Sequence, residues 1–460
     1  MDSPETLPPE VWRPARRAAR RLISPIQRFL AIEAASGLLL LAATAAALIW
    51  ANSAWRGSYE ELWHTPIGFQ LASWSFVRPL HFWVNDALMT VFFFVAGLEI
   101  RRELYEGELA DLRRAALPLI AALGGMLVPA AIYGALNAGR AGSPGWGIPM
   151  ATDIAFAVGV LTLLGRRVPP ALRVLLLGLA VIDDVGAILV IALFYGDGIA
   201  MSGLVVTAIG LAAVVLMRGS GIRSPLWYVG PGAVVWAGLY ATGVHPTLAG
   251  VLLGLVTPAR PWFGQSGFAA TTREHMDDIE GTSDRNKLRE RLTAIETARR
   301  EAISPAERMQ HVLHPWVAFA IMPLFALANA GVRLGGADLG GDGLFIFLGV
   351  VLGLAVGKPL GITALSAAGT AARIAGLPPG CAHRGVGLVG VVGGIGFTMS
   401  LFIAQLAFPR GPLLDTAKLG ILVGSGAAMV LGLVLGLMTL RPRTIAAEPP
   451  PANEPIAVER

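Results

Sequence analysis

The sequence has few charged residues and almost no cysteine. Lys, Arg, Asp and Glu make up 15% of its 460 residues, whereas hydrophobic residues make up 54%. A soluble domain of this length has to cover its surface with polar groups, so the mean hydropathy of +0.63 excludes that class. Cys381 is the one cysteine, which also excludes an intrachain disulfide.

The formal net charge of +5 does not indicate a nucleic-acid-binding protein. The basic residues lie between apolar runs and form no basic face, so they fit the bias of membrane proteins toward positive cytoplasmic loops. Arginines crowd the first 28 residues and the loops near 101–114, 166–173, 218–223 and 373–384. We therefore expect these segments on one side, with both termini cytoplasmic.

The apolar residues gather in long runs separated by short polar connections. A bilayer is crossed by about 20 apolar residues in a helix, and 56 glycines are typical of closely packed membrane helices. We predict an all-α polytopic membrane protein of about twelve transmembrane helices. The runs cover residues 29–51, 82–100, 115–137, 147–164, 171–195, 201–217, 225–242, 244–258, 315–333, 343–367, 385–408 and 413–440.

The polar segments divide the chain. We predict a cytoplasmic segment over 1–28, a transmembrane domain over 29–440 and a disordered cytoplasmic tail over 441–460. A cleaved signal peptide is the alternative at the N-terminus, but the first run is long enough to span. Residues 52–80 are predicted as a periplasmic loop with a short hairpin. Residues 259–313 form a long charged cytoplasmic loop, in which 284–301 reads as an amphipathic helix, solvated in its plainest interpretation.

Ionisable residues within the apolar runs are the strongest functional signal. Each costs roughly 2.5–3.5 kcal/mol on insertion scales, and such residues are usually functional. Asp183 and Asp184 are adjacent in one run, Asp153 lies in another and Lys358 in a third. Consecutive helical residues point about 100° apart, so one aspartate can face an aqueous path while the other faces Lys358. A purely structural Asp183–Lys358 salt bridge is the alternative, and it leaves Asp184 without a cation.

Two adjacent carboxylates repel each other, which favours protonation of one of them. Such a group can hold a proton or a hard cation, since both prefer anionic oxygen. This exclusive choice is the chemistry of ion/proton exchange, and the predicted ion-binding residues are Asp183 and Asp184.

Two of the apolar runs contain helix breakers. Pro149 precedes Thr152 and Asp153, and a glycine-rich break at 393–396 interrupts the run 385–408. Irregular backbone at membrane depth is tolerated only beside protein or water, so paired breaks predict a transporter site between inverted repeats. Asp153 would neutralise positive helix ends and Lys358 negative ones. Close helix packing is the other explanation of the glycines.

A second charged cluster ends the run 82–100. Glu99, Arg102 and Glu103 lie there, and His311 begins a later span. Histidine titrates near neutrality, so these residues are candidates for a response to pH, with a snorkelling helix end as the plain alternative.

These motifs together resemble the NhaA family of sodium/proton antiporters over roughly residues 25–440. The matching stretches are FVAGLE at 94–99, ATDIAFA at 151–157, IDD at 182–184, GVHPTLAG at 243–250, HVLHPW at 311–316, GKPLG at 357–361 and GIGFTMS at 394–400.

The resemblance implies inverted repeats with crossed, interrupted fourth and eleventh helices. It further implies electrogenic, pH-regulated exchange of one Na⁺ or Li⁺ for two protons in a bacterial inner membrane, with no cofactor. Asp184 matches the main ion carrier, Asp183 its neighbour paired with Lys358, and Thr152 and Asp153 the helix crossing. The segment near 56–80 looks like the family's hairpin that joins two protomers. Gln310 and Glu307 depart from the family's pH-response pattern.

Other functions fit the sequence less well. An intramembrane aspartyl protease needs aspartates on separate helices and a Gly-x-Gly-Asp element, which this chain lacks. A passive cation channel needs a continuous pore, whereas paired carboxylate and lysine suit a gated carrier. K⁺/H⁺ exchange and pH sensing are the remaining alternatives.

Overall fold

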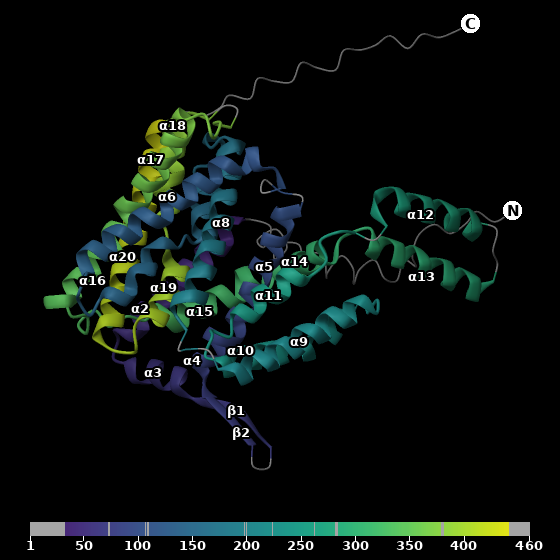
Figure 1. The fold of residues 1–460 in the computed structure, drawn as a ribbon, viewed down its shortest axis with the longest axis horizontal. Coiled ribbons are helices and arrows are strands. Elements are labelled where there is room, and N and C mark those ends of the chain that lie inside the picture. The colour runs from purple at the N-terminus through teal and green to yellow at the C-terminus, as the bar shows by residue number, and fades with distance from the viewer. Residues whose placement is uncertain are drawn as a thin grey trace, which may run out of the picture.

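The structure is a computed structural model that describes residues 33–71, 74–105, 107, 110–196, 198, 200–222, 224–261, 263–280, 284–378 and 381–440. Its described elements form a helical bundle with one short β-hairpin (Figure 1). The predicted segments 1–28 and 441–460 lie outside the described residues. The principal elements are α2 (Glu33–Ala51), α3 (Arg56–His64), β1 (Pro66–Leu71), β2 (Trp74–Pro79), α4 (Leu80–Phe82), α5 (Met89–Tyr105), α6 (Leu112–Asn137), α7 (Ile154–Leu163), α8 (Pro170–Phe194), α9 (Met201–Gly219), α10 (Val229–Thr242), α11 (Leu248–Val256), α12 (Gly264–Glu280), α13 (Arg285–Glu301), α14 (Pro305–Trp316), α15 (Met322–Asn329), α16 (Gly341–Leu352), α17 (Lys358–Ala371), α18 (His383–Gly393), α19 (Phe397–Ala407) and α20 (Pro412–Thr439).

Several long helices change their winding along their length. A 3₁₀ segment, η3 (Ser143–Met150), precedes α7 across a short break. Three π-helical segments, η1 (Trp83–Leu88), η6 (Val317–Ile321) and η7 (Gly353–Gly357), continue directly into α5, α15 and α17. Such segments occur mostly as single turns within α-helices, frequently at functional sites.

Eight helical segments of the described chain are long and apolar enough to cross a membrane, and ten if each of two bent pairs is one span. The bent pairs are α2 with α3, at 113°, and α18 with α19, at 48°. α10 and α11 are shorter, with 14 and 9 residues, and Gly243 ends α10 at a φ of +87°. The predicted all-α membrane fold is confirmed, whereas the count of twelve spans stays a prediction.

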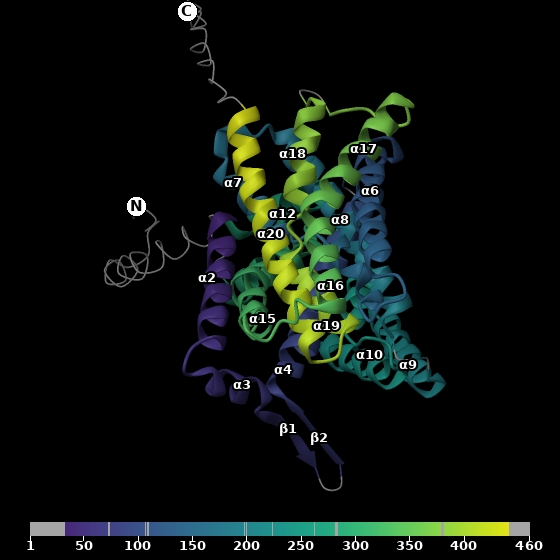
Figure 2. The same cartoon turned by 90° about the vertical axis from the view of Figure 1, so that its left-hand side faces the viewer.

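Glycines bring the helices close together. α6 and α17 meet at Gly124 and Gly361, where a Cβ on either residue would collide with the backbone carbonyl of the other. α20, α18 and α17 run side by side in the same bundle (Figure 2). The most deeply buried of the eight long segments is α8, which carries both adjacent aspartates. α8 in turn packs on α6 and α18.

Two parts of the described chain project from the bundle. β1 and β2 pair antiparallel from Pro66–Pro79 to Leu71–Trp74, in the segment 52–80 where a hairpin was expected. α12 and α13 pack on each other and extend away from the bundle at another place (Figure 1). α13 occupies the segment predicted to be an amphipathic helix. The loop 259–313 is thus a helical pair, extended at its end by the first turns of α14.

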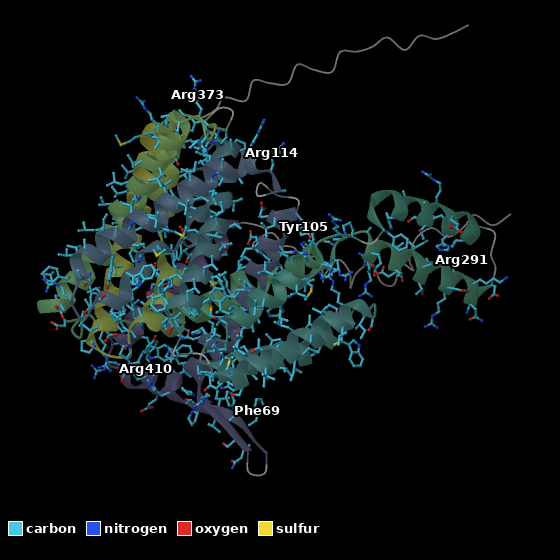
Figure 3. The ribbon with its side chains drawn as sticks, viewed as in Figure 1. Phe69, Tyr105, Arg114, Arg291, Arg373 and Arg410 are labelled. Carbon is cyan, nitrogen blue, oxygen red and sulfur yellow. The ribbon has the colours of Figure 1, made fainter. Side chains whose placement is uncertain are left out.

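Arginines from two of the connections lie at the end of the bundle opposite the hairpin. Arg114 and Arg373 lie at that end, while Phe69 and Arg410 lie at the hairpin end (Figure 3). The assignment of this end to the cytoplasm stays a prediction.

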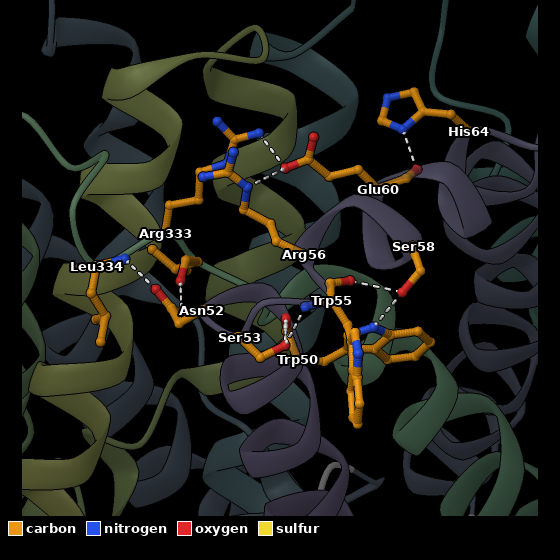
Figure 4. A network of polar contacts seen from close by, with 11 residues as sticks. Trp50, Asn52, Ser53, Trp55, Arg56, Ser58, Glu60, His64, Arg333 and Leu334 are labelled. Atoms are coloured by element: carbon orange, nitrogen blue, oxygen red, sulfur yellow. Dashed lines mark hydrogen bonds and ion pairs between the residues drawn. The ribbon is translucent and has the colours of Figure 1, made fainter.

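The hairpin end is held by a network between α2, α3 and the loop after α15 (Figure 4). Asn52 donates to the Val332 carbonyl at 2.8 Å and accepts from the Leu334 backbone N–H at 3.0 Å. Glu60 pairs with Arg333, and Arg56 lies 3.8 Å away on the same helix. These contacts fix the sharp α2–α3 bend.

Candidate functional site: two buried carboxylates at a helix crossing

The adjacent aspartates lie in the middle of α8. Asp183 is 1% exposed and Asp184 is 7% exposed. Pro170 begins this helix at a position where a missing N–H costs nothing, and apolar residues then continue for most of its 25 residues. Two carboxylates in such surroundings need a proton, a cation or hydrogen-bond donors.

The two interrupted helices meet beside α8. Between η3 and α7 the chain is extended through Ala151 and Asp153, and the Asp153 backbone N–H donates to the Ile395 carbonyl at 2.7 Å. Ile395 lies in the break between α18 and α19. The Ser400 hydroxyl of α19 donates to the Ile148 carbonyl of η3 at 2.7 Å. Each break thus satisfies backbone groups that the other leaves open.

Asp153 caps two helices at once. Its Oδ1 accepts from the Phe156 backbone N–H of α7 at 3.3 Å. Its Oδ2 accepts from the Thr398 backbone N–H of α19 at 3.1 Å and from the Thr398 hydroxyl. A carboxylate is stabilised at helix N-termini because unpaired N–H groups and the helix dipole point at it. Asp153 is therefore placed to balance two positive helix ends.

Lys358 lies where the opposite charge is needed. Its ammonium donates to the Met150 carbonyl, at the C-terminal end of η3, and lies 2.6 Å from Asp183 Oδ2. Lys358 is fully buried and begins α17 directly after the π-helical segment η7. The Thr152 hydroxyl lies 2.6 Å from the same Asp183 oxygen and 3.0 Å from the Gly393 carbonyl. One cation therefore holds a helix end and a carboxylate together.

Asp184 is left without such support. Among the described residues, its Oδ1 is buried and has no hydrogen-bond partner, and Asp183 Oδ1 is in the same state. Buried polar atoms are almost always paired, so two orphaned carboxylate oxygens on neighbouring residues indicate a place for a proton, a bound cation or an ordered water. Of these, a proton or a cation would also balance the negative charge, and among the described residues no ion pair does so for Asp184.

The second predicted cluster is looser. Arg102 lies 3.7 Å from Glu103 at the end of α5, and Glu99 lies one turn earlier. α14 packs on α5, but its His311 is exposed, and among the described residues no ion pair joins it to Glu99 or Arg102. The structure thus places the four predicted pH-response residues on two packed helices without a direct link to His311.

Sequence reasoning did not assign Thr398, Ser400 or Met150 to the site. Thr398 and Ser400 follow the glycine break directly, and a hydroxyl next to interrupted backbone is a signal that could have identified them. The Met150 carbonyl could not be identified from sequence, because every residue carries one.

Comparison with known proteins supports the resemblance described above. The family model for Na⁺/H⁺ antiporter 1 matches residues 27–435. A "Na(+)/H(+) antiporter NhaA 2" of Sorangium cellulosum is 55% identical over 440 residues, covering 95% of this chain and 94% of the relative. A relative of the same name from Myxococcus xanthus is 53% identical over 458 residues, covering 99% and 97%. A "Na(+)/H(+) antiporter NhaA" of Janthinobacterium is 50% identical over 440 residues, covering 94% and 97%. The chain belongs to the Na⁺/H⁺ antiporter 1 family.

Proposed function

We propose that this protein is a secondary transporter that exchanges cytoplasmic Na⁺ or Li⁺ for external protons across a bacterial inner membrane. The observation that carries the proposal is the state of Asp184, a buried carboxylate with an orphaned oxygen beside the Asp183–Lys358 pair. Na⁺ and H⁺ are its substrates. Each neutralises the carboxylate alone, so binding of one displaces the other.

The proposed exchange is electrogenic, with two protons moved for each Na⁺. Asp184 and Asp183 are the proposed carriers of ions and protons. When the Asp183 carboxylate takes up a proton, its attraction to Lys358 falls, and the ammonium can shift toward the Met150 carbonyl alone. Lys358 then links proton binding at Asp183 to the neutralisation of the negative end of η3. Thr152 and Asp153 keep the crossing in place during this change.

The proposed protein has both termini in the cytoplasm and responds to pH. Glu99, Arg102, Glu103 and His311 are the proposed pH-response residues, at the end of α5 and on α14. Lipid and a second copy of the chain are the proposed partners, and no cofactor is involved.

Asp184→Asn tests the central claim. The amide keeps the size of the side chain, but it carries no negative charge and does not titrate near neutral pH. It can therefore neither take up a proton nor neutralise a cation, so we expect exchange to disappear while the protein stays in the membrane. Na⁺, Li⁺ or K⁺ is added to acid-loaded inverted vesicles, and the pH gradient is followed with a fluorescent dye. Normal Na⁺-driven dissipation in the variant would remove Asp184 from the mechanism.

Asp284→Asn is the matched control. Asp284 caps α13 on an exposed helix, and asparagine caps a helix about as well as aspartate. This variant should exchange normally. A response of the parent protein to K⁺ equal to its response to Na⁺ would favour K⁺/H⁺ exchange instead.

A further inference from the structure

A cavity of about 720 Å³ opens at the hairpin end of the bundle. Its lining includes Glu60 of α3, Arg410 of the α19–α20 connection, and Asn85, Phe402 and Gln405. None of the three site aspartates Asp153, Asp183 and Asp184 lines it. The residues between the cavity and the aspartates therefore close this end of the bundle in the conformation described.

A series of hydrogen bonds connects side chains that line the cavity with the buried Asn329 behind them. The Arg410 guanidinium donates to His81 Nδ1 at 3.3 Å, and His81 Nε2 donates to Asn329 Oδ1 at 2.8 Å. Asn329 Nδ2 then donates to Asn85 Oδ1 at 2.7 Å, and Asn85 Nδ2 donates to Gln405 Oε1. Asn329 is fully buried and Asn85 is 7% exposed. This series of hydrogen bonds joins α4, η1, α15 and α19 to one another.

Aromatic contacts lie beside these hydrogen bonds. Phe402, 1% exposed, packs on Phe93 of α5 and on His245, each with ring centroids 5.3 Å apart, and on Phe325 of α15 at 6.2 Å. Like the hydrogen bonds, these contacts join α19 to α15, and they also join α19 to α5, into which η1 continues. We call the hydrogen-bonded residues Asn85, Asn329 and Gln405, together with Phe402, the seal.

α19 connects the seal to the aspartates. Thr398, Phe402 and Gln405 stand at positions i, i+4 and i+7, so they share one face of this 11-residue helix. Thr398 binds Asp153 at one end of that face, and Gln405 binds Asn85 near the other. A displacement of α19 at Asp153 must therefore change the contacts of Gln405.

The seal is incompletely satisfied. Gln405 Nε2 is buried without a hydrogen-bond partner among the described residues. Asn85 also lies in the π-helical segment η1, whose winding differs from that of the α-helix it joins. A polar network that is only partly satisfied is costly to hold, so a second arrangement of the same groups is energetically within reach.

We propose that the hydrogen-bonded set Asn85, Asn329 and Gln405, with Phe402, is the external gate of the ion path. The gate is closed in this structure, and it opens when α19 moves in response to ion exchange at the aspartates. The proposal rests on the proposed function, because it takes the hairpin end as external. Its residues are gating residues that do not themselves bind the transported ions.

The test measures access to the site and needs no transport. A reporter is made by Asp184→Cys in a Cys381→Ser background, and right-side-out vesicles are treated with a membrane-impermeant thiol reagent. Gln405→Leu removes the acceptor for Asn85 at similar volume. We expect it to speed labelling from outside by about tenfold, the shift that follows from losing one such hydrogen bond. Phe402→Ala should speed labelling at least as much.

Leu401→Ala is the matched control. Leu401 is fully buried on the same helix but does not line the cavity, so its truncation should leave the labelling rate unchanged. Unchanged labelling in Gln405→Leu overturns the proposal, and so does an equal increase in Leu401→Ala, because general loosening would explain it. Gln405→Leu carries the test alone if Phe402→Ala does not reach the membrane. Normal Na⁺-driven exchange in Asp184→Asn would refute the proposed function without changing the labelling result.

Discussion

Lys358 shows how one buried charge can serve a helix end and a side chain together. Its ammonium is fully enclosed, and its two described contacts are the Met150 carbonyl and the Asp183 carboxylate. Removing one partner of a buried ion pair costs about 3–5 kcal/mol because the other charge stays buried and unpaired. We therefore expect Lys358→Met to lower the melting temperature of the purified protein strongly.

The double variant Asp183→Asn with Lys358→Met separates charge from packing. It removes both charges of this ion pair, so neither is left buried without its partner, and it should recover most of the stability lost in Lys358→Met. Melting in detergent, followed by tryptophan fluorescence, measures both. A Lys358→Met protein that melts like the parent would show that the ion pair contributes little to stability.

Among single residues, the charged ones can be assigned to the site from the sequence, whereas the neutral polar ones are harder to assign. Asp153, Asp183, Asp184 and Lys358 stand out because each interrupts an apolar run. Asn329 is as deeply buried as Lys358 but carries no charge, and a neutral amide near the end of a helix has many plain explanations. Its partners come from distant parts of the chain, so only the fold reveals the network.

At the scale of single elements, small residues decide how closely helices approach. Gly124 of α6 faces Gly361 of α17 so closely that a methyl group at either position meets backbone. We expect Gly124→Ala to destabilise the protein by about 1–3 kcal/mol, since the helices must separate. Thermal unfolding of the purified variant measures this.

Gly134 on the same helix is the matched control. A Cβ there has no neighbour within 4 Å, and alanine is the better helix former by about 0.5–1 kcal/mol. Gly134→Ala should be as stable as the parent or slightly more stable. If both variants lost stability equally, the close α6–α17 contact would not be the cause.

The apolar runs predict the helices well but not where they break. Eleven-residue α19 and its neighbour α18 fall within one predicted run, and the glycines at 393–396 marked the bend between them. The bend between α2 and α3 had no comparable expectation. It depends on contacts with Val332 and Leu334, which lie far away in sequence. Local composition therefore predicts helices, while distant contacts fix their angles.

At the scale of the whole molecule, the β-hairpin is an exposed surface that calls for a partner. Ile67, Phe69 and Val77 are 45%, 67% and 44% exposed on two strands whose outer edges are unpaired in the described chain. Such edges favour pairing with another chain. Since we propose a second copy of the chain as the partner, we expect the parent protein to be a dimer and the variant in which a short linker replaces residues 66–79 to be a monomer, as measured by light scattering in detergent. A dimer of unchanged mass would place the subunit contact elsewhere.

Removing the α12–α13 pair tests whether the bundle transports ions without it. The two ends of this pair meet, because the Phe263 backbone N–H donates to the Glu301 carbonyl at 3.2 Å. A short Gly-Ser linker in place of 264–301 can therefore close the chain without moving α11 or α14. Since the pair extends away from the bundle (Figure 1), we expect the excised protein to reach the membrane and to exchange ions at the parental rate. Dye measurements over a range of pH would check the rate and its pH profile together. A normal rate with a shifted profile would assign the pair to regulation, because α14, which follows it directly, carries His311 and packs on α5.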